Sequence, residues 1–220
     1  MILNELQIIE RLTRADESGI VIKPIINLKN QLGPSSIDVR LGSEFKVIRR
    51  QRYTHLDPVR VEEVKQIERD VKRYTEEVLV RIHPKYGGFV LHPGEFALGS
   101  TLEYICLPND LAARLEGRSS WSRLGLQIHI TGGFIDPGFR GSITFEFCNL
   151  GTVPVLLYVG LRVGQLAFYE ILESLKPYSE KVRPKYARQV GTGTSLYYED
   201  SEWAILRKLY QEARKGVREP

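Results

Sequence analysis

The strongest constraint on the fold is the regular spacing of turn signals between Gly87 and Glu170. Short runs rich in Val, Ile, Phe and Tyr, which are enriched in strands, are interrupted by Gly, Pro or Asn at intervals of about 8–12 residues. This pattern is typical of an antiparallel sandwich or barrel with jelly-roll-like connections. Strands and helices do not alternate, and no internal repeat stands out. We therefore predict a mainly β fold with a few peripheral helices.

The chain before this region predicts a few further elements. Residues 4–14 carry apolar side chains close to helical spacing, and Asn4 is a suitable N-cap. Residues 19–25 favour a short strand and residues 28–36 favour a loop. Residues 36–50 predict one or two strands, because polar and apolar side chains alternate there.

Residues 1–195 are expected to form one domain with two peripheral segments. Residues 60–76 are charged, with apolar residues at steps of three and four, and predict a helical insertion on the surface. Acidic and basic residues are nearly balanced there, which favours a solvated face over a polyanion-binding one. Residues 177–195 are polar, basic and Gly-rich, as in a mobile lid arm. Residues 196–220 predict a C-terminal helical extension that docks on the body or on a neighbouring subunit.

Charge and composition limit the class of partner. The formal net charge is +4, with 31 Lys and Arg interspersed among 27 Asp and Glu. We therefore expect a pocket for a small polyanion and no binding to a nucleic-acid polymer. No run of about 18 apolar residues occurs, and the first residues are charged, so we expect a cytoplasmic protein without membrane contact. Cys106 and Cys148 lie in apolar runs and are expected to be buried core thiols.

Several catalytic patterns do not occur in the sequence. These are the GxxxxGK[ST] phosphate loop, the GxGxxG dinucleotide loop and the HExxH metal motif. The zinc-dependent cytosine deaminases need HxE and PCxxC motifs, because His and Cys hold the metal that activates water, and neither motif occurs. We therefore expect a mechanism without zinc and no metal site built from protein ligands.

A polar turn, GRSSWSR, opens a region dense in functional side chains. Arg118 and Arg123 carry two guanidinium groups, and Ser119 and Ser120 carry two adjacent hydroxyls. Guanidinium groups match phosphate oxygens with paired hydrogen bonds, so this composition suits a phosphate chain. The alternative is an exposed turn that only caps a helix.

The segment TGGFIDPGFRGSITFEF adds glycines and carboxylates. Gly132 and Gly133 have no Cβ and let the backbone approach a ligand closely. Asp136 precedes a Pro-Gly turn, where its alternative role is an Asx turn. Glu146 lies in an apolar strand on the same face as Thr144, so it faces either solvent or a polar partner.

Six segments, in order and at suitable spacing, resemble the trimeric dCTP deaminases of the dUTPase-like superfamily. They are SIDVRLG (36–42), LHPGEFALGSTLEYICLP (91–108), EGRSSWSRLGL (116–126), GFIDPGFRGSITFEFCN (133–149), VGQLAF (163–168) and PKYARQVGTGTS (184–195). The resemblance implies a distorted β-sandwich of the jelly-roll-like β-clip type that forms a homotrimer. Each active site would then be shared between subunits.

The resemblance also implies roles for individual residues. Glu146 corresponds to the proton shuttle of the family, which activates the water that attacks C4 of cytosine. Arg123 and Ser119 correspond to residues that position this water and the base, and the backbone carbonyl near Gly132 helps to hold the water.

Further positions correspond to nucleotide contacts of the family. Arg118 and Ser120 fall where the triphosphate is bound, and Asp136 falls where the 3′-hydroxyl is contacted. The positions that contact phosphate or close over the nucleotide are Gln165, Tyr178, Lys185, Tyr186 and Gln189. Magnesium would enter as a partner of the triphosphate, consistent with its preference for phosphate oxygens.

The resemblance distinguishes two related activities. Phe139 stands where plain dUTPases have Tyr, and Glu146 stands where they usually have an apolar residue, which favours deamination. TGGFID is close to the TAGFID of members that continue to dUMP, with Gly132 in place of Ala. We rank hydrolysis of dCTP to dUTP and ammonia first, with continuation to dUMP and diphosphate left open. The alternatives are a diphosphatase acting on dUTP only and a non-catalytic nucleotide-binding regulator.

Overall fold

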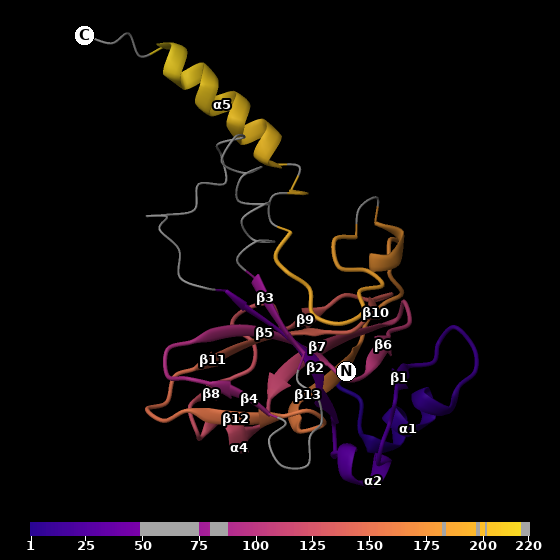
Figure 1. Cartoon of the computed structure of the whole chain (residues 1–220). Helices are drawn as coiled ribbons and strands as arrows, with labels where there is room; N and C mark the ends of the chain where they lie inside the picture. The colour runs from indigo at the N-terminus through magenta and orange to yellow at the C-terminus, as the bar shows by residue number, and fades with distance from the viewer. Residues whose placement is uncertain (49–74, 80–87, 182–183, 197–198, 201, 217–220) are drawn as a thin grey trace. The chain divides into compact units, whose positions relative to one another are not determined.

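The computed structural model describes residues 1–48, 75–79, 88–181, 184–196, 199–200 and 202–216 (Figure 1). The chain divides into two compact units. The first unit comprises Met1–Val47 and Glu77–Gly193, and the second comprises Ile48–Glu76 and Thr194–Pro220. The first unit carries every candidate site residue and nearly all of the strand residues.

An eight-stranded antiparallel sheet dominates the fold, as the sequence predicts (Figure 1). Its strand order is β8-β11-β5-β2-β13-β7-β9, with β3 paired to β2 beside this path. The strands are β2 (Ile37–Ile48), β3 (Thr75–Leu79), β5 (Phe96–Thr101), β7 (Leu111–Gly117), β8 (Leu126–Gln127), β9 (Phe134–Ile135), β11 (Thr144–Asn149) and β13 (Arg162–Glu170).

Two smaller sheets complete the strands of the described residues. One has the order β1-β6-β10 and the other pairs β12 with β4. Their strands are β1 (Val21–Lys23), β4 (Gly88–Leu91), β6 (Tyr104–Cys106), β10 (Arg140–Gly141) and β12 (Val155–Tyr158). The short strands and frequent turns agree with the turn spacing of the sequence.

Alternating burial along β11 orients the site. Phe145 and Phe147 are fully buried and their ring centroids lie 5.4 Å apart, whereas Thr144, Glu146 and Cys148 are half-buried on the opposite face. The face that carries the two Phe side chains is buried because removal of apolar surface from water is favourable. The predicted shared face of Thr144 and Glu146 is confirmed.

The prediction of buried core thiols was wrong for both cysteines. Cys148 lies on the half-buried face of β11, and Cys106 is also half-buried in β6, where Ile105 takes the inward position. The apolar composition of both runs was correct, but strand alternation sends every second side chain outward.

Helices lie outside the sheets and mostly follow the sequence signals. α1 (Glu5–Thr13) begins at Asn4, which forms a capping box with Gln7. α2 (Leu28–Gln31) is a single turn inside the expected loop, because the Asn27 side chain accepts a hydrogen bond from Asn30 N and caps it. α4 (Ser119–Ser122), the 3₁₀ turn η1 (Tyr178–Glu180) and α5 (Glu202–Gly216) complete the set.

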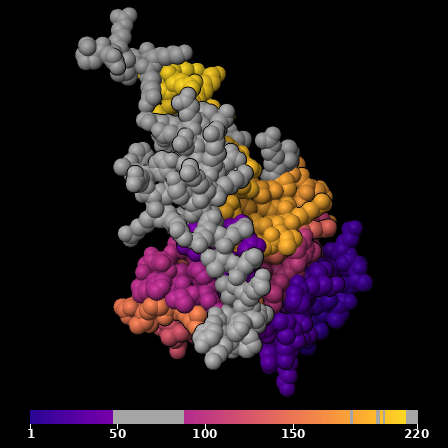
Figure 2. Space-filling view, viewed as in Figure 1, coloured from indigo at the N-terminus to yellow at the C-terminus, as the bar shows by residue number. Residues whose placement is uncertain are grey.

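The N-terminal segment packs against β13. Leu3 N donates a hydrogen bond to Phe168 O at 3.0 Å, and Ile2 forms a bridge with Tyr169. Figure 2 shows this segment (indigo) as part of the surface of the first unit. None of the helices that can be described has the length and apolar character needed to cross a bilayer.

The peripheral segments have different outcomes. The predicted helix over residues 60–76 lies outside the described residues except for Thr75 and Glu76, which begin β3. The predicted C-terminal helix is confirmed as α5, and its docking stays a prediction. The arm predicted over residues 177–195 hydrogen-bonds to the body, where Arg188 N donates to Arg140 O at 2.6 Å.

The connection from β5 to β6 contains a buried carboxyl group, that of Glu103. Glu103 is fully buried and accepts hydrogen bonds from Arg40 N at 2.8 Å and from Gln31 Nε2 at 3.3 Å. Burial raises the pKa of Glu103 to about 7, although both hydrogen bonds oppose the rise. The folded protein therefore keeps the Glu103 proton to higher pH than the unfolded chain does.

We expect the free energy of unfolding to decrease as pH rises from 5 to 8, because the folded state binds the extra proton only below its own pKa. The Glu103 contribution to this decrease is about 3 kcal/mol, and Glu103→Gln should lack it. Urea unfolding of both proteins at each pH and at equal protein concentration measures the difference. Glu173→Gln, at an exposed position, is the control. Equal pH dependence of wild type and Glu103→Gln would contradict this expectation.

Candidate active site

The carboxylate of Glu146 is held by the backbone of the neighbouring segment. Ile130 N donates to Glu146 Oε2 at 2.7 Å, and Glu146 N donates to Ile128 O at 2.8 Å. Two hydrogen bonds from one segment fix both the main chain and the side chain of this residue. The alternative in which Glu146 simply faces solvent does not describe this arrangement, because the side chain is half-buried and has a backbone donor.

The two glycines that precede β9 have different roles. A Cβ on Gly132 would lie 3.3 Å from Glu146 Oε1, so the backbone at this position closely faces the carboxylate. Gly133 is buried, and a Cβ there would lie 2.9 Å from Leu115 O. Gly133 therefore serves packing against β7, and Gly132 is the glycine that lines the site. His129, which the sequence reasoning missed, packs beside Gly133, and its buried Nδ1 has no hydrogen-bond partner among the described residues.

The GRSSWSR turn forms α4 and presents its polar side chains outward. Ser119, Ser120 and Arg123 are exposed. The N-cap of α4 is Arg118, and no side chain caps the helix, so the helix-capping alternative is not supported. Trp121 anchors the turn, because its Nε1 donates to Arg162 O at 2.9 Å. The turn is thus fixed to the start of β13, and the hydroxyls of Ser119 and Ser120 lie on the exposed side of the turn.

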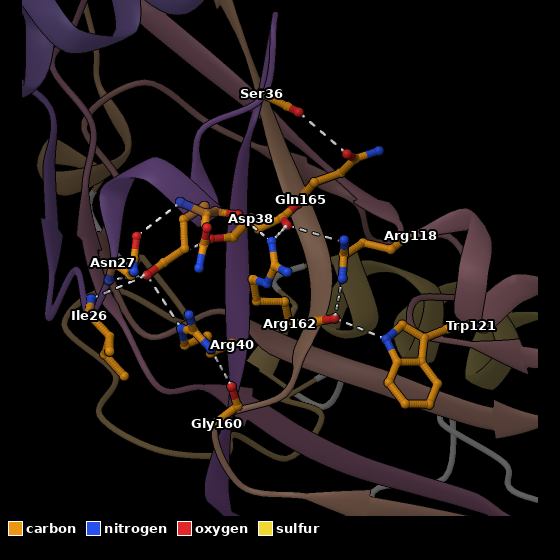
Figure 3. Close-up of polar contacts among 12 residues, drawn as sticks. Ile26, Asn27, Ser36, Asp38, Arg40, Arg118, Trp121, Gly160, Arg162 and Gln165 are labelled. Atoms are coloured by element: carbon orange, nitrogen blue, oxygen red, sulfur yellow. Dashed lines mark hydrogen bonds and ion pairs between the residues drawn. The ribbon is translucent and has the colours of Figure 1, made fainter.

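Arg118, which follows β7 and is the N-cap of α4, belongs to a polar cluster with residues of β2 and β13 (Figure 3). Its Nε lies 3.2 Å from Asp38 Oδ2, and its Nη1 donates to Arg162 O at 3.1 Å. Gln165, paired with Asp38 in the sheet register, accepts a hydrogen bond from Ser36 Oγ at 3.3 Å. The structure therefore brings together two predicted phosphate contacts, Arg118 and Gln165, with residues to which the sequence reasoning gave no role.

Asp136 pairs with a lysine that the sequence reasoning missed. Its carboxylate lies 2.8 Å from Lys181 Nζ, whose ammonium also lies 4.8 Å from the ring centroid of Tyr178. The backbone carbonyl of Asp136 accepts from Phe139 N at 3.2 Å, so the turn closes through the main chain and the carboxylate is not used in an Asx turn. Only the proximity of the arm to this turn could have indicated Lys181.

Three further arm residues lie beside the Asp136 turn and β11. Tyr186 N donates to Tyr178 Oη at 2.9 Å, which ties two predicted nucleotide contacts together. Lys185 precedes Tyr186 and is half-buried. Gln189 Nε2 donates to Thr144 Oγ1 at 2.8 Å, two residues before Glu146 on the same face of β11. The arm therefore reaches the strand that carries the candidate proton shuttle.

An open pocket lies between the arm and the Asp136 turn. Two arginines contribute positive charge to it; its lining is Gly138, Arg140, Ser179, Pro184, Ala187 and Arg188. Each arm residue in this lining is next to a predicted nucleotide contact. The surroundings of that contact set therefore suit an anionic ligand.

The predicted site residues fall into two groups. Within the described residues, no hydrogen bond or ion pair joins Glu146 to Ser119 or to Arg123. The Glu146 group comprises Glu146, Gly132, Asp136, Tyr178, Lys185, Tyr186 and Gln189. The Arg118 group comprises Arg118, Ser119, Ser120, Arg123 and Gln165.

Comparison with known proteins identifies the family. Residues 2–171 match the family described as dCTP deaminase-like. A protein of Methanobrevibacter smithii named dCTP deaminase, dUMP-forming, is 43% identical over 189 residues, covering 85% of this chain and 92% of the relative. A protein of Mycobacterium avium with the same name is 46% identical over 170 residues, covering 76% and 83%. The chain belongs to the dCTP deaminase-like family.

A solved structure supports the fold. The 2′-deoxycytidine 5′-triphosphate deaminase of Agrobacterium tumefaciens superposes with a TM-score of 0.55 and 24% sequence identity. The match covers 76% of this chain and 46% of that chain. It confirms the predicted mainly β architecture.

Proposed function

We propose that the protein hydrolyses dCTP to dUTP and ammonia and then converts dUTP to dUMP and diphosphate. The observation that carries the proposal is the Glu146 carboxylate, which is fixed by Ile130 N and faced by Gly132 on the outward side of β11. The names of the Methanobrevibacter and Mycobacterium relatives support dUMP as the final product.

In the first reaction Glu146 acts as general base and then as general acid. It takes a proton from water as the water oxygen attacks C4 of cytosine, and it delivers a proton to N3. Glu146 then takes the proton of the new C4 hydroxyl and gives it to the amino group, so that the C4–N4 bond breaks, ammonia leaves and the C4 carbonyl of dUTP forms. The Ile130 N–H on Oε2 keeps the carboxylate in one orientation during both transfers. Ser119 and Arg123 would position the attacking water and the base.

The second reaction attacks the triphosphate. Water attacks the α-phosphorus of dUTP and diphosphate leaves, which gives dUMP. Asp136, close to the 3′-hydroxyl in this proposal, orients the hydrolytic water. Arg118, Ser120 and Gln165 bind the phosphates, and the arm residues Tyr178, Lys185, Tyr186 and Gln189 close over the nucleotide.

Magnesium accompanies the triphosphate in this proposal. The described residues contain no group of three His, Cys, Asp or Glu that could hold a metal ion, so phosphate oxygens would be its main ligands. The bound ion would neutralise charge on the phosphates during release of diphosphate. Arg118 and the arginines beside the arm add positive charge from the protein.

A shared site in a homotrimer is consistent with the lack of a hydrogen bond or ion pair between Glu146 and Ser119 or Arg123 among the described residues. The Glu146 group of one subunit would face the Arg118 group of the next subunit. A heterologous contact of this kind closes into a ring with one complete site at each interface.

Glu146→Gln should abolish release of ammonia from dCTP and leave nucleotide binding intact, because the amide keeps the shape and cannot take the proton. We expect the rate of ammonia release to fall by about 10²–10⁴-fold or more. Purified protein is incubated separately with dCTP and with dUTP plus magnesium, and ammonia and diphosphate are measured from each. Glu173→Gln is the control. Retained turnover would exclude the assigned role. For the wild type, release of diphosphate from dUTP without release of ammonia from dCTP would favour a diphosphatase. Nucleotide binding by the wild type without either product would favour a regulator.

Asp136→Asn should reduce release of diphosphate from dUTP more than release of ammonia from dCTP, since only the second reaction uses this carboxylate on water. The substitution also breaks the ion pair with Lys181, so Lys181→Gln is the matched control. If Lys181→Gln reproduces the whole defect, the carboxylate has no role of its own in hydrolysis. Ammonia and diphosphate assays on both variants measure the ratio.

Mixed trimers of Glu146→Gln and Arg123→Gln should recover activity that neither variant has alone. With one Glu146 and one Arg123 from adjacent subunits in each site, random mixing predicts about a quarter of wild-type activity. The two tagged variants are co-expressed, purified together and assayed for ammonia. Mixtures as inactive as the separate variants would show that each subunit completes its own site.

A further inference from the structure

The carboxylate of Asp38 lies between two guanidinium groups. Asp38 Oδ2 is 3.2 Å from Arg118 Nε and 3.0 Å from Arg162 Nη1 (Figure 3). Its side chain is 13% exposed, against 29% for Arg118 and 31% for Arg162. The carboxylate is therefore the inner member of the set, and the two cations are its outer members.

The contacts of Arg118 restrict its guanidinium to one orientation. Its Nε faces Asp38 and its Nη1 donates to the carbonyl oxygen of Arg162, which also accepts from Trp121 Nε1. A guanidinium is planar, so two fixed nitrogens determine the direction of the third. Among the described residues, Arg118 Nη2 has no hydrogen-bond partner. The Nε and Nη1 atoms of the guanidinium thus contact groups of the chain, and Nη2 is left for a ligand.

Arg162 is held through a single nitrogen. Its Nη1 donates to Asp38 Oδ2 and to the carbonyl oxygen of Asn30. Asp38 stands opposite Gln165 in the register of β2 and β13, and Gln165 is one of the proposed phosphate contacts. The set of two cations and one carboxylate has a net charge of +1 and lies next to an amide that can donate to phosphate.

We infer that Asp38 is a positioning residue for triphosphate recognition, which holds Arg118 and Arg162 as a pair of phosphate-binding guanidinium groups. The inference rests on the proposed function and extends it to two residues, Asp38 and Arg162. A purely structural role would require only that the ion pairs stabilise the sheet. The positioning role requires in addition that substitution of Asp38 weakens binding of the phosphate part of the ligand.

Charge and geometry make opposite demands on this carboxylate. Its negative charge opposes binding of a polyanion, so removal of the charge alone would tighten binding. Its position orients the two forks, so removal of the orientation weakens binding. We expect the orientation to dominate, because a bidentate contact depends on both nitrogens meeting their oxygens.

The test measures binding of dCTP, deoxycytidine and inorganic triphosphate by calorimetry to wild type, Asp38→Asn and Asp38→Glu. Glu keeps the charge and displaces the carboxylate. We expect affinity for dCTP and inorganic triphosphate to fall about 10- to 100-fold in both variants. Affinity for deoxycytidine should stay unchanged. In turnover, KM for dCTP should rise more than kcat falls.

Two controls separate positioning from stability. Asp110→Asn breaks another Asp–Arg pair, in which Asp110 Oδ2 lies 2.7 Å from Arg11 Nη2. This substitution should leave the affinities for all three ligands unchanged. In a background that carries both Arg118→Gln and Arg162→Gln, adding Asp38→Asn should change triphosphate affinity by less than about twofold, because both groups that Asp38 orients are gone. Thermal unfolding identifies any variant that does not fold, and Arg162→Gln then takes its place with the same expected loss.

The outcomes are distinct. Tighter or unchanged triphosphate binding in folded Asp38→Asn overturns the positioning role. Equal losses for deoxycytidine and dCTP also overturn it, because they indicate a general distortion. If wild type binds triphosphate but does not release ammonia, the proposed activity fails while the positioning role stands. If wild type binds none of the three ligands, both fail.

Discussion

The pleat of β11 is the constraint on which the site depends. Burial of Phe145 and Phe147 contributes about 3–6 kcal/mol, and it is possible only in the register that turns Thr144 and Glu146 to the other face. A shift of one residue would place a carboxylate in the core, which costs more than the rings gain. The hydrogen bond from Ile130 N then fixes the orientation of the Glu146 carboxylate on this face of the strand. Hydrophobic packing thus determines where the Glu146 carboxylate lies.

Short-range pattern predicted much of this arrangement. Strand alternation placed Glu146 and Thr144 on one face, and Asn4 marked the start of α1. The pairs of Asp38 with Arg118 and of Asp136 with Lys181 could not be predicted, because their members lie on elements far apart in sequence. Their proximity follows from strand order, which no local pattern encodes. The prediction of buried cysteines failed for a related reason, because apolar composition does not show on which face of a strand a side chain lies.

The same limitation applies to the assignment of roles. Residues of the GRSSWSR turn resembled phosphate contacts, but their orientation depends on groups outside the turn. Trp121 ties the turn to β13, and Asp38 on β2 sets the plane of Arg118. A motif therefore supplies the chemical groups, and the sheet beneath it supplies their directions.

The hydrogen bond from Gln189 to Thr144 bears on how strongly the arm can respond to a nucleotide. A contact from this amide to phosphate has to replace a bond that already exists within the chain. Each such bond contributes about 1 kcal/mol net, so the exchange is close to balanced. Small changes in the ligand, such as the loss of one phosphate, would then be enough to return the arm to Thr144. If Gln189 contacts phosphate as proposed, its amide would exchange Thr144 Oγ1 for a phosphate oxygen when the nucleotide binds, and the reverse exchange would favour departure of the product.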